Sequence, residues 1–141
     1  MDQAKVAVNM LVLKNGKALF LKRKGGSGDK MWCMPGGHLE FREELAKGAI
    51  REVKEEANIK VKNVRFLCVS EDIYTKKHYV SVFFAADHTS GIAHITEKDR
   101  FYELGWFSLE KPPKPLFGGT KNVMAGKCFP SDWKNRLKKK H

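Results

Sequence analysis

The sequence predicts a mixed fold of the α/β or α+β class, in which antiparallel strands flank one long helix. Two pairs of apolar, β-branched runs indicate the strands, and an amphipathic segment between the two pairs indicates the helix. The chain has 141 residues, of which 42% are hydrophobic and 11% aromatic. This length and composition exclude wholesale disorder and favour a single domain over residues 1–141.

The first two strands are expected at residues 4–13 and 17–23, where aliphatic side chains dominate. Asn15-Gly16 lies between them, and two strand-like runs joined by Asn-Gly are a strong hairpin signal. A glycine-rich polar loop follows at residues 24–30. Flexible surface loops share this composition, so the loop by itself is weak evidence for phosphate binding.

The helix is expected over residues 44–57, with Asn58 as its left-handed terminator. At about 100° per residue, Glu52, Glu55 and Glu56 share one face of this helix. An apolar stripe on another face is expected to pack on the sheet, and it consists of Ala46, Ile50, Val53 and Ala57. We therefore expect the acidic face to be turned away from that packing.

The second pair of strands is expected at residues 64–69 and 79–84, with a turn at 75–78 between them. A short strand is expected at residues 104–107. A short helix is expected at residues 120–128, after a proline-rich segment that interrupts regular structure.

The chain is strongly basic, with 27 Lys and Arg against 16 Asp and Glu and a formal net charge of +11. Such a charge favours anionic ligands, which include nucleotides, nucleic acid and acidic lipids, and does not choose among them. Part of the excess forms a basic C-terminal tail at about residues 134–141. This tail is either a solvated end or a contact for nucleic acid or another partner.

The distribution of apolar, charged and cysteine residues along the sequence excludes several classes of protein. A membrane-spanning helix needs about 20 apolar residues, and the longest candidate, Val6–Leu13, is short and contains Asn9. The first five residues lack the basic-then-apolar plan of a signal peptide. The three cysteines form no C-x-x-C pair, which favours free thiols over a disulfide framework. We therefore expect a cytoplasmic protein without a membrane span.

Two interpretations of the three clustered glutamates are open. Glutamate is a good helix former, and an acidic helix face is often only solvated. However, like charges at this spacing destabilise a helix by a few tenths of a kcal/mol per pair. A hard cation such as Mg²⁺ or Mn²⁺ would relieve that repulsion, since it takes carboxylate oxygens and keeps waters.

A longer pattern contains these glutamates. A tight Pro35-Gly36-Gly37 turn precedes the helix. From Gly37 the chain reads Gly, five residues, Glu43, seven residues, then Arg51-Glu52-Val53-Lys54-Glu55-Glu56-Ala57-Asn58-Ile59. This stretch resembles the Nudix box of the Nudix hydrolases, departing only at Asn58, where the family usually has Gly. The resemblance implies the Nudix fold, a mixed β-sheet sandwiched between helices (α/β/α).

The resemblance also implies a divalent-metal hydrolase of nucleoside diphosphates linked to another group, with Mg²⁺ as cofactor and Mn²⁺ as a substitute. The implied metal ligands are the Gly36 carbonyl, Glu52 and Glu56, with Glu55 as a further ligand or a water-orienting carboxylate. Further catalytic residues are implied to be Glu43, which would support the metal site, and Arg51, which would orient the carboxylates. Loss of Glu56 is expected to remove activity while the fold survives, because its face need not pack.

The general base varies across the family, and in several members it is a glutamate in a loop shortly before a Trp-containing strand. Glu103, three positions before Trp106, fits this description best. Glu97 and Asp99 lie in the same segment and are alternatives. A surface carboxylate at a strand edge is the equally open structural interpretation of Glu103.

Within the family, residues 35–41 and 78–80 are similar to the small nucleoside-triphosphate diphosphatases, which release a nucleoside monophosphate and pyrophosphate. The candidate substrate contacts are Lys22, Arg23, Gly37 and His38. Lys22 and Arg23 can equally protect a strand edge, and His38 can be a structural loop residue. Two aromatic residues could stack on a base or belong to the core, and these are Trp32 and Phe41.

Other substrates stay open within the same chemistry: nucleoside diphosphate sugars, dinucleoside polyphosphates and capped RNA. A different class of function is that of a nucleotide- or nucleic-acid-binding module that has lost catalysis. The intact set of Glu43, Arg51, Glu52, Glu55 and Glu56 argues against that class. The expected partners are therefore a nucleotide substrate, with a homodimer and nucleic acid possible and no membrane.

Overall fold

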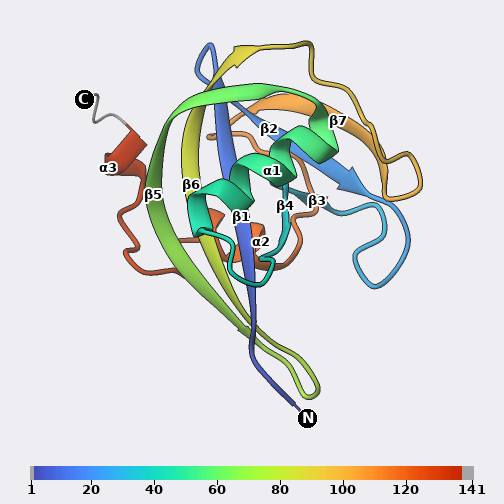
Figure 1. Ribbon diagram of the computed structural model, residues 1–141, viewed down its shortest axis with the longest axis vertical. Coiled ribbons are helices and arrows are strands. Elements are labelled where there is room, and N and C mark those ends of the chain that lie inside the picture. The colour runs from blue at the N-terminus through green and yellow to red at the C-terminus, as the bar shows by residue number, and fades with distance from the viewer. Residues whose placement is uncertain (1, 138–141) are drawn as a thin grey trace.

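The computed structural model of the protein describes residues 2–137 and consists of one mixed β-sheet with helices on both of its faces (Figure 1). The strands are β1 (Lys5–Lys14), β2 (Lys17–Arg23), β3 (Trp32–Cys33), β4 (Gly36–His38), β5 (Lys60–Ile73), β6 (His78–Ser90) and β7 (Phe101–Ser108). The helices are α1 (Leu45–Ala57), α2 (Gly118–Met124) and α3 (Lys134–Leu137). The predicted α/β/α arrangement is confirmed.

The strands follow the order β3-β2-β1-β6-β5, with β4 added to β1 and β7 added to β2. The predicted hairpin of β1 and β2 has its tight turn at Asn15 and Gly16, whose φ angles are 50° and 77°. The two strands share only two residue pairs and then diverge. β1 runs parallel to β6, while β2 pairs with β7, so most of the pairing is between segments far apart in the sequence.

β1 lies in the middle of the sheet and is buried on both faces, which explains its nearly continuous aliphatic sequence. Val8, Met10 and Val12 pack beneath α1. Leu11 points to the opposite face, where Val123 of α2 and the buried Trp133 complete a second cluster. The two clusters hold α1 and α2 on opposite sides of β1, the strand that pairs with β4.

Several predicted boundaries differ from the observed ones. β5 and β6 continue well beyond the apolar runs at residues 64–69 and 79–84, because their polar ends pair through the backbone while their side chains face solvent. β7 is likewise longer than residues 104–107. α2 begins at Gly118 and ends at Met124 rather than near 128, because Gly126 adopts a left-handed φ of 74° and breaks the helical pattern.

α1 ends as predicted, with Asn58 in the left-handed conformation and its N–H donating to the Lys54 carbonyl at 3.0 Å. Its buried apolar side chains are Ala49, Val53 and Ala57. Ile50 is 39% exposed, so its predicted place in the packed stripe is wrong.

The remaining sequence expectations have mixed outcomes. Cys33, Cys68 and Cys128 are free thiols, as predicted. Among residues 2–137, no helix is both long and apolar enough to span a membrane. The start of the predicted basic tail forms α3, and its last residues, 138–141, lie outside the described part of the chain.

Candidate active site

Two glutamates of α1 lie against the glycine turn that forms β4. The backbone N–H of Gly36 donates to Glu56 Oε1 at 3.0 Å. A Cβ atom on Gly37 would lie 2.6 Å from Glu52 Oε2, so only glycine lets the strand approach this carboxylate so closely. Because β4 pairs with β1 through Asn9 and Gly36, the sheet fixes the position of β4 and therefore of both contacts.

The guanidinium group of Arg51 binds three carboxylates, those of Glu43, Glu52 and Glu55. Its Nε and Nη2 donate to the two oxygens of Glu43 at 2.7 and 3.0 Å, a bidentate pair. Its Nη1 donates to Glu52 Oε1 at 2.7 Å and to Glu55 Oε1 at 3.0 Å, and its Nη2 to the carbonyl of His38 at 3.2 Å. The bond from Arg51 lowers the pKa of Glu43 to about 2, so Glu43 is ionised at neutral pH.

The expectation that the acidic face is turned away from the packing is wrong for Glu56 and Glu52. Glu56 is fully buried and Glu52 is 7% exposed. Glu52 lies against Gly37 of β4. Glu56 is covered by the segment after β6, whose N–H groups at His94 and Thr96 donate to the carbonyls of Ala57 and Glu56 at the end of α1. The helix sequence alone cannot show that a segment so distant in the chain covers it.

Burial gives Glu56 an unusual protonation state. Desolvation, with a smaller contribution from the negative charge of Glu52, raises its pKa to about 9 despite the bond from Gly36. Arg100 places Nη1 3.9 Å from Glu56 Oε2. Within residues 2–137, that oxygen makes no hydrogen bond. A buried carboxyl oxygen without a donor is suited to accept a cation, whose charge would replace the proton.

The three candidates for a general base occupy different positions relative to the glutamates of α1. Glu103 is exposed on β7 and paired in register with Lys22. Neither Glu103 nor Glu97 is among the residues that line the cleft described below. Asp99 is also exposed. Glu97 accepts from Arg100 at 3.4 Å, and the same guanidinium group approaches Glu56. Of the three, Glu97 is the one linked to the buried glutamate.

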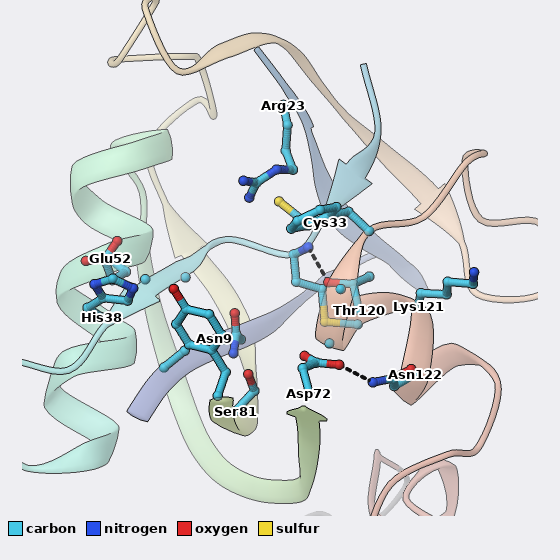
Figure 2. Close-up of a pocket in the computed structure, with 18 of the residues that line it drawn as sticks. Asn9, Arg23, Cys33, His38, Glu52, Asp72, Ser81, Thr120, Lys121 and Asn122 are labelled. Carbon is cyan, nitrogen blue, oxygen red and sulfur yellow. Dashed lines mark hydrogen bonds between the residues drawn. The ribbon is translucent and has the colours of Figure 1, made fainter. Parts of the chain in front are cut away.

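A cleft of about 1140 Å³ opens beside the carboxylates. Glu52 and His38 lie on one wall, and Thr120 and Lys121 of α2 on the opposite wall (Figure 2). Its cationic lining residues are Arg23, Arg51, Lys77, Arg100, Lys121 and Lys127. A cleft that combines carboxylates with basic side chains is suited to an anionic ligand that also binds metal.

Three of the four predicted substrate contacts, Arg23, Gly37 and His38, line this cleft. Lys22 does not, because its ammonium group lies over the ring of Trp32, 6.0 Å from the centroid. His38 stacks on Tyr79 with 5.7 Å between ring centroids.

The two aromatic residues considered for stacking on a base differ in burial. Trp32 is 7% exposed and belongs to the core. Phe41 is 94% exposed, so it is no part of the core.

Sequence reasoning missed the far end of the cleft. There Asn122 Nδ2 donates to Asp72 Oδ1 at 2.6 Å (Figure 2). The same nitrogen donates to Ser70 Oγ at 3.1 Å. The backbone N–H of Met34 donates to Thr120 Oγ1 at 2.9 Å, which ties α2 to the strand side of the cleft. All of these partners are far apart in the sequence, so no local motif signals them.

The residues present fit a divalent cation. Carboxylate and carbonyl oxygens are the donors that Mg²⁺ and Mn²⁺ prefer, and Glu56 offers an unpaired one. In the part of the chain that the structure describes, no three acidic, His or Cys side chains form a ready-made metal cluster. Arg51 holds Glu52 and Glu55 instead. The site therefore suits an ion that takes few protein ligands and keeps several waters, as Mg²⁺ does.

Gly37→Ala tests whether the position of Glu52 matters. The atoms nearest to the new methyl group would be those at the flexible end of the Glu52 side chain, so the fold should tolerate it while the carboxylate is displaced. We expect kcat/KM to fall by about 10–100-fold, the range for disturbing the surroundings of a metal ligand, with little change in Tm. Steady-state kinetics and thermal unfolding measure the two effects. An unchanged kcat/KM would contradict a role for this contact.

The chain resembles known proteins in sequence and in fold. A family model described as NUDIX domain matches residues 3–125. An ADP-ribose pyrophosphatase of Methanocaldococcus jannaschii is 31% identical over 120 residues, which are 84% of this chain and 70% of that protein. An NAD-capped RNA hydrolase NudC of Pectobacterium atrosepticum is 28% identical over 74% of this chain, which spans only 39% of that protein. The crystal structure of a MutT NUDIX hydrolase from Burkholderia pseudomallei matches with a TM-score of 0.83 and 30% identity, covering 88% of this chain and 98% of that chain.

Proposed function

The chain belongs to the Nudix family of pyrophosphohydrolases, and on that premise we propose that it cleaves nucleoside or deoxynucleoside triphosphates to the monophosphate and pyrophosphate. The observation that carries the proposal is the cleft. It joins a wall that can hold a cation to a group of basic side chains, among them Arg23, Arg100 and Lys121. A triphosphate carries several negative charges, and both walls would be needed to neutralise them.

The metal proposed for this reaction is Mg²⁺, with Mn²⁺ as a substitute, held by Glu52, Glu56 and the carbonyl oxygen of Gly36. When bound, such a cation neutralises charge on the phosphate oxygens and lowers the pKa of the attacking water. Arg51 keeps Glu52 and Glu55 in place by the hydrogen bonds described above. Glu43 in turn fixes the guanidinium plane of Arg51.

The proton of the attacking water is proposed to pass to the carboxylate of Glu97. This residue is tied through Arg100 to the neighbourhood of Glu56, as Glu103 is not. Glu55, whose side chain is 48% exposed, can orient that water from the solvent side. The free thiols are the observation that supports a cytoplasmic location.

A second candidate substrate is ADP-ribose, which the relative from Methanocaldococcus jannaschii is named for. Both substrates contain a phosphoanhydride next to a nucleoside, so the metal wall would serve either. They differ in what the basic side chains of the cleft must contact. A triphosphate presents further phosphates, whereas ADP-ribose presents a ribose phosphate.

Product analysis decides between them. The purified protein with Mg²⁺ is incubated separately with each nucleoside triphosphate, ADP-ribose, a nucleoside diphosphate sugar, a dinucleoside polyphosphate and NAD-capped RNA, and the products are separated by anion-exchange chromatography. We expect the highest kcat/KM for a triphosphate, with equal amounts of monophosphate and pyrophosphate. Higher kcat/KM for ADP-ribose would overturn the substrate assignment. Absence of any product, together with salt-sensitive binding of oligonucleotides, would support a binding module.

A further inference from the structure

The glycine-rich loop of residues 24–30 is tethered at both ends, although its composition is that of a flexible segment. Asp29 Oδ1 accepts from the N–H of Gly25 at 2.7 Å and from the hydroxyl of Tyr102, on β7, at 3.0 Å. At the neck of the loop, Arg23 N–H donates to the Met31 carbonyl at 2.8 Å and Lys30 N–H donates to the Arg23 carbonyl at 2.7 Å. The loop is thereby held in one position relative to β2 and β7.

The tethered loop presses Gly28 onto the side chain of Arg23. Gly28 is buried, and a Cβ atom there would lie 2.6 Å from Arg23 Nε and 2.7 Å from the ring of Phe117. The Arg23 guanidinium group lies over the same Phe117 ring, with Cζ 4.0 Å from the centroid. Arg23 Nε is buried and makes no hydrogen bond to any residue in the range 2–137. Gly28 thus packs at the edge where the Arg23 guanidinium group and the Phe117 ring meet, and Gly28 and Phe117 together form a clamp on Arg23.

Phe117 is itself fixed, because its N–H donates to the carbonyl of Trp32 in β3 at 2.9 Å. Arg23 and Phe117 both line the cleft, and Figure 2 shows the guanidinium group beside Cys33, directed toward the wall that carries Glu52. The clamp covers the Nε edge and one face of the guanidinium group. Its terminal nitrogens are left on the cleft side, where a phosphate group can accept two parallel hydrogen bonds.

We propose that Gly28 and Phe117 are positioning residues, which hold Arg23 as a preorganised anion-binding fork for the phosphate chain of the substrate. An arginine that is already immobilised loses less side-chain entropy on binding. The proposal rests on the proposed function for the identity of the natural ligand. The fork itself is testable with an inorganic anion.

A double-mutant cycle tests the clamp. The variants are Gly28→Ala, Arg23→Ala and both together. Gly26→Ala is the control, because a methyl group at Gly26, whose φ is 70°, strains the loop backbone but meets nothing within 4 Å. The Kd of inorganic tripolyphosphate is measured by calorimetry without metal, and KM and kcat are measured with the best nucleotide substrate.

We expect Gly28→Ala to raise Kd and KM about tenfold, equivalent to about 1.4 kcal/mol, with kcat within about twofold. Gly26→Ala should leave all three unchanged, because the strain it adds to the loop does not reach the guanidinium group of Arg23.

Coupling separates a clamp from a general disturbance of the loop. If Gly28 acts through Arg23, then Gly28→Ala has no further effect once Arg23 is alanine. Additive effects, or an equal effect of Gly26→Ala, would overturn the proposal. If Gly28→Ala fails to fold, Phe117→Leu removes the ring without adding atoms to the loop, and the same non-additivity is required of it.

The two proposals fail in different ways. Arg23-dependent tripolyphosphate binding without hydrolysis of any nucleotide would keep the clamp and reject the triphosphate substrate. Triphosphate hydrolysis that Gly28→Ala leaves unchanged would keep the function and reject the clamp.

Discussion

Glu56→Gln is expected to lower kcat/KM by more than 100-fold, beyond the roughly 10–100-fold that loss of an outer partner of a metal ligand costs, while the metal-free protein stays folded. Glutamine keeps an oxygen for the N–H of Gly36 but offers no negative charge to a cation. The fold survives because the substitution conserves volume in a buried position. The reason that the sequence suggested, that this helix face does not pack, is wrong.

The same variant has a pH signature in the absence of metal. Burial first, and Glu52 after it, raise the pKa of Glu56 from its ordinary value of 4.5 to about 9. A raised pKa contributes stability that is fully present below pH 4.5 and is lost as the pH rises through 9. Glutamine does not titrate, so in EDTA the Tm of the variant minus that of the wild type should increase between about pH 5 and about pH 9.

Thermal unfolding over this pH range measures the effect, with Glu44→Gln as control. Glu44 is exposed at the start of α1, paired only with Lys47 among the described residues, and should change neither Tm nor kcat/KM. A Tm difference that is constant with pH would show that Glu56 titrates normally in the folded protein.

Arg51→Ala is the second large effect, and it should reduce both stability and activity. Arg51 donates to Glu43, Glu52 and Glu55, and its removal leaves these carboxylates facing one another without a counter-ion. Loss of a charged hydrogen-bond partner of this kind costs about 1–3 kcal/mol of unfolding free energy. The displaced Glu52 should lower kcat/KM at least about tenfold.

Urea unfolding at pH 7 in EDTA measures the stability change, and steady-state kinetics with Mg²⁺ measures the activity change. Arg51→Lys should recover only part of each, because an ammonium group cannot reproduce the bidentate bond to Glu43. Lys54→Ala, an exposed neighbour on the same helix, is the control and should change neither. Full recovery by lysine would show that charge alone, without the fork geometry, organises the site.

The sequence pattern predicted the part of the site that is local in the chain. Arg51, Glu52 and Glu55 lie together because one helix carries them, and helical periodicity places Arg51 within reach of Glu55. The left-handed end of α1 at Asn58 was predictable for the same reason. Such features depend only on short separations along the sequence.

The contacts that were mispredicted or missed are long-range. Burial of Glu56 comes from the segment that contains Thr96, and Glu97 is linked to that glutamate through Arg100. A helical projection shows which residues share a face but not which segment covers it. The parallel pairing of β1 with β6 similarly joins strands from distant parts of the chain, and the Asn-Gly turn could not indicate it.

The account depends most on a cation bound between β4 and α1. Crystals soaked in Mn²⁺ with a slowly hydrolysed nucleotide, measured at the manganese absorption edge, test this directly. We predict an anomalous peak in contact with Glu52, Glu56 and the carbonyl oxygen of Gly36, with the phosphates of the nucleotide beside it. A peak elsewhere in the cleft, or none while Glu56 remains next to Arg100, would contradict the account.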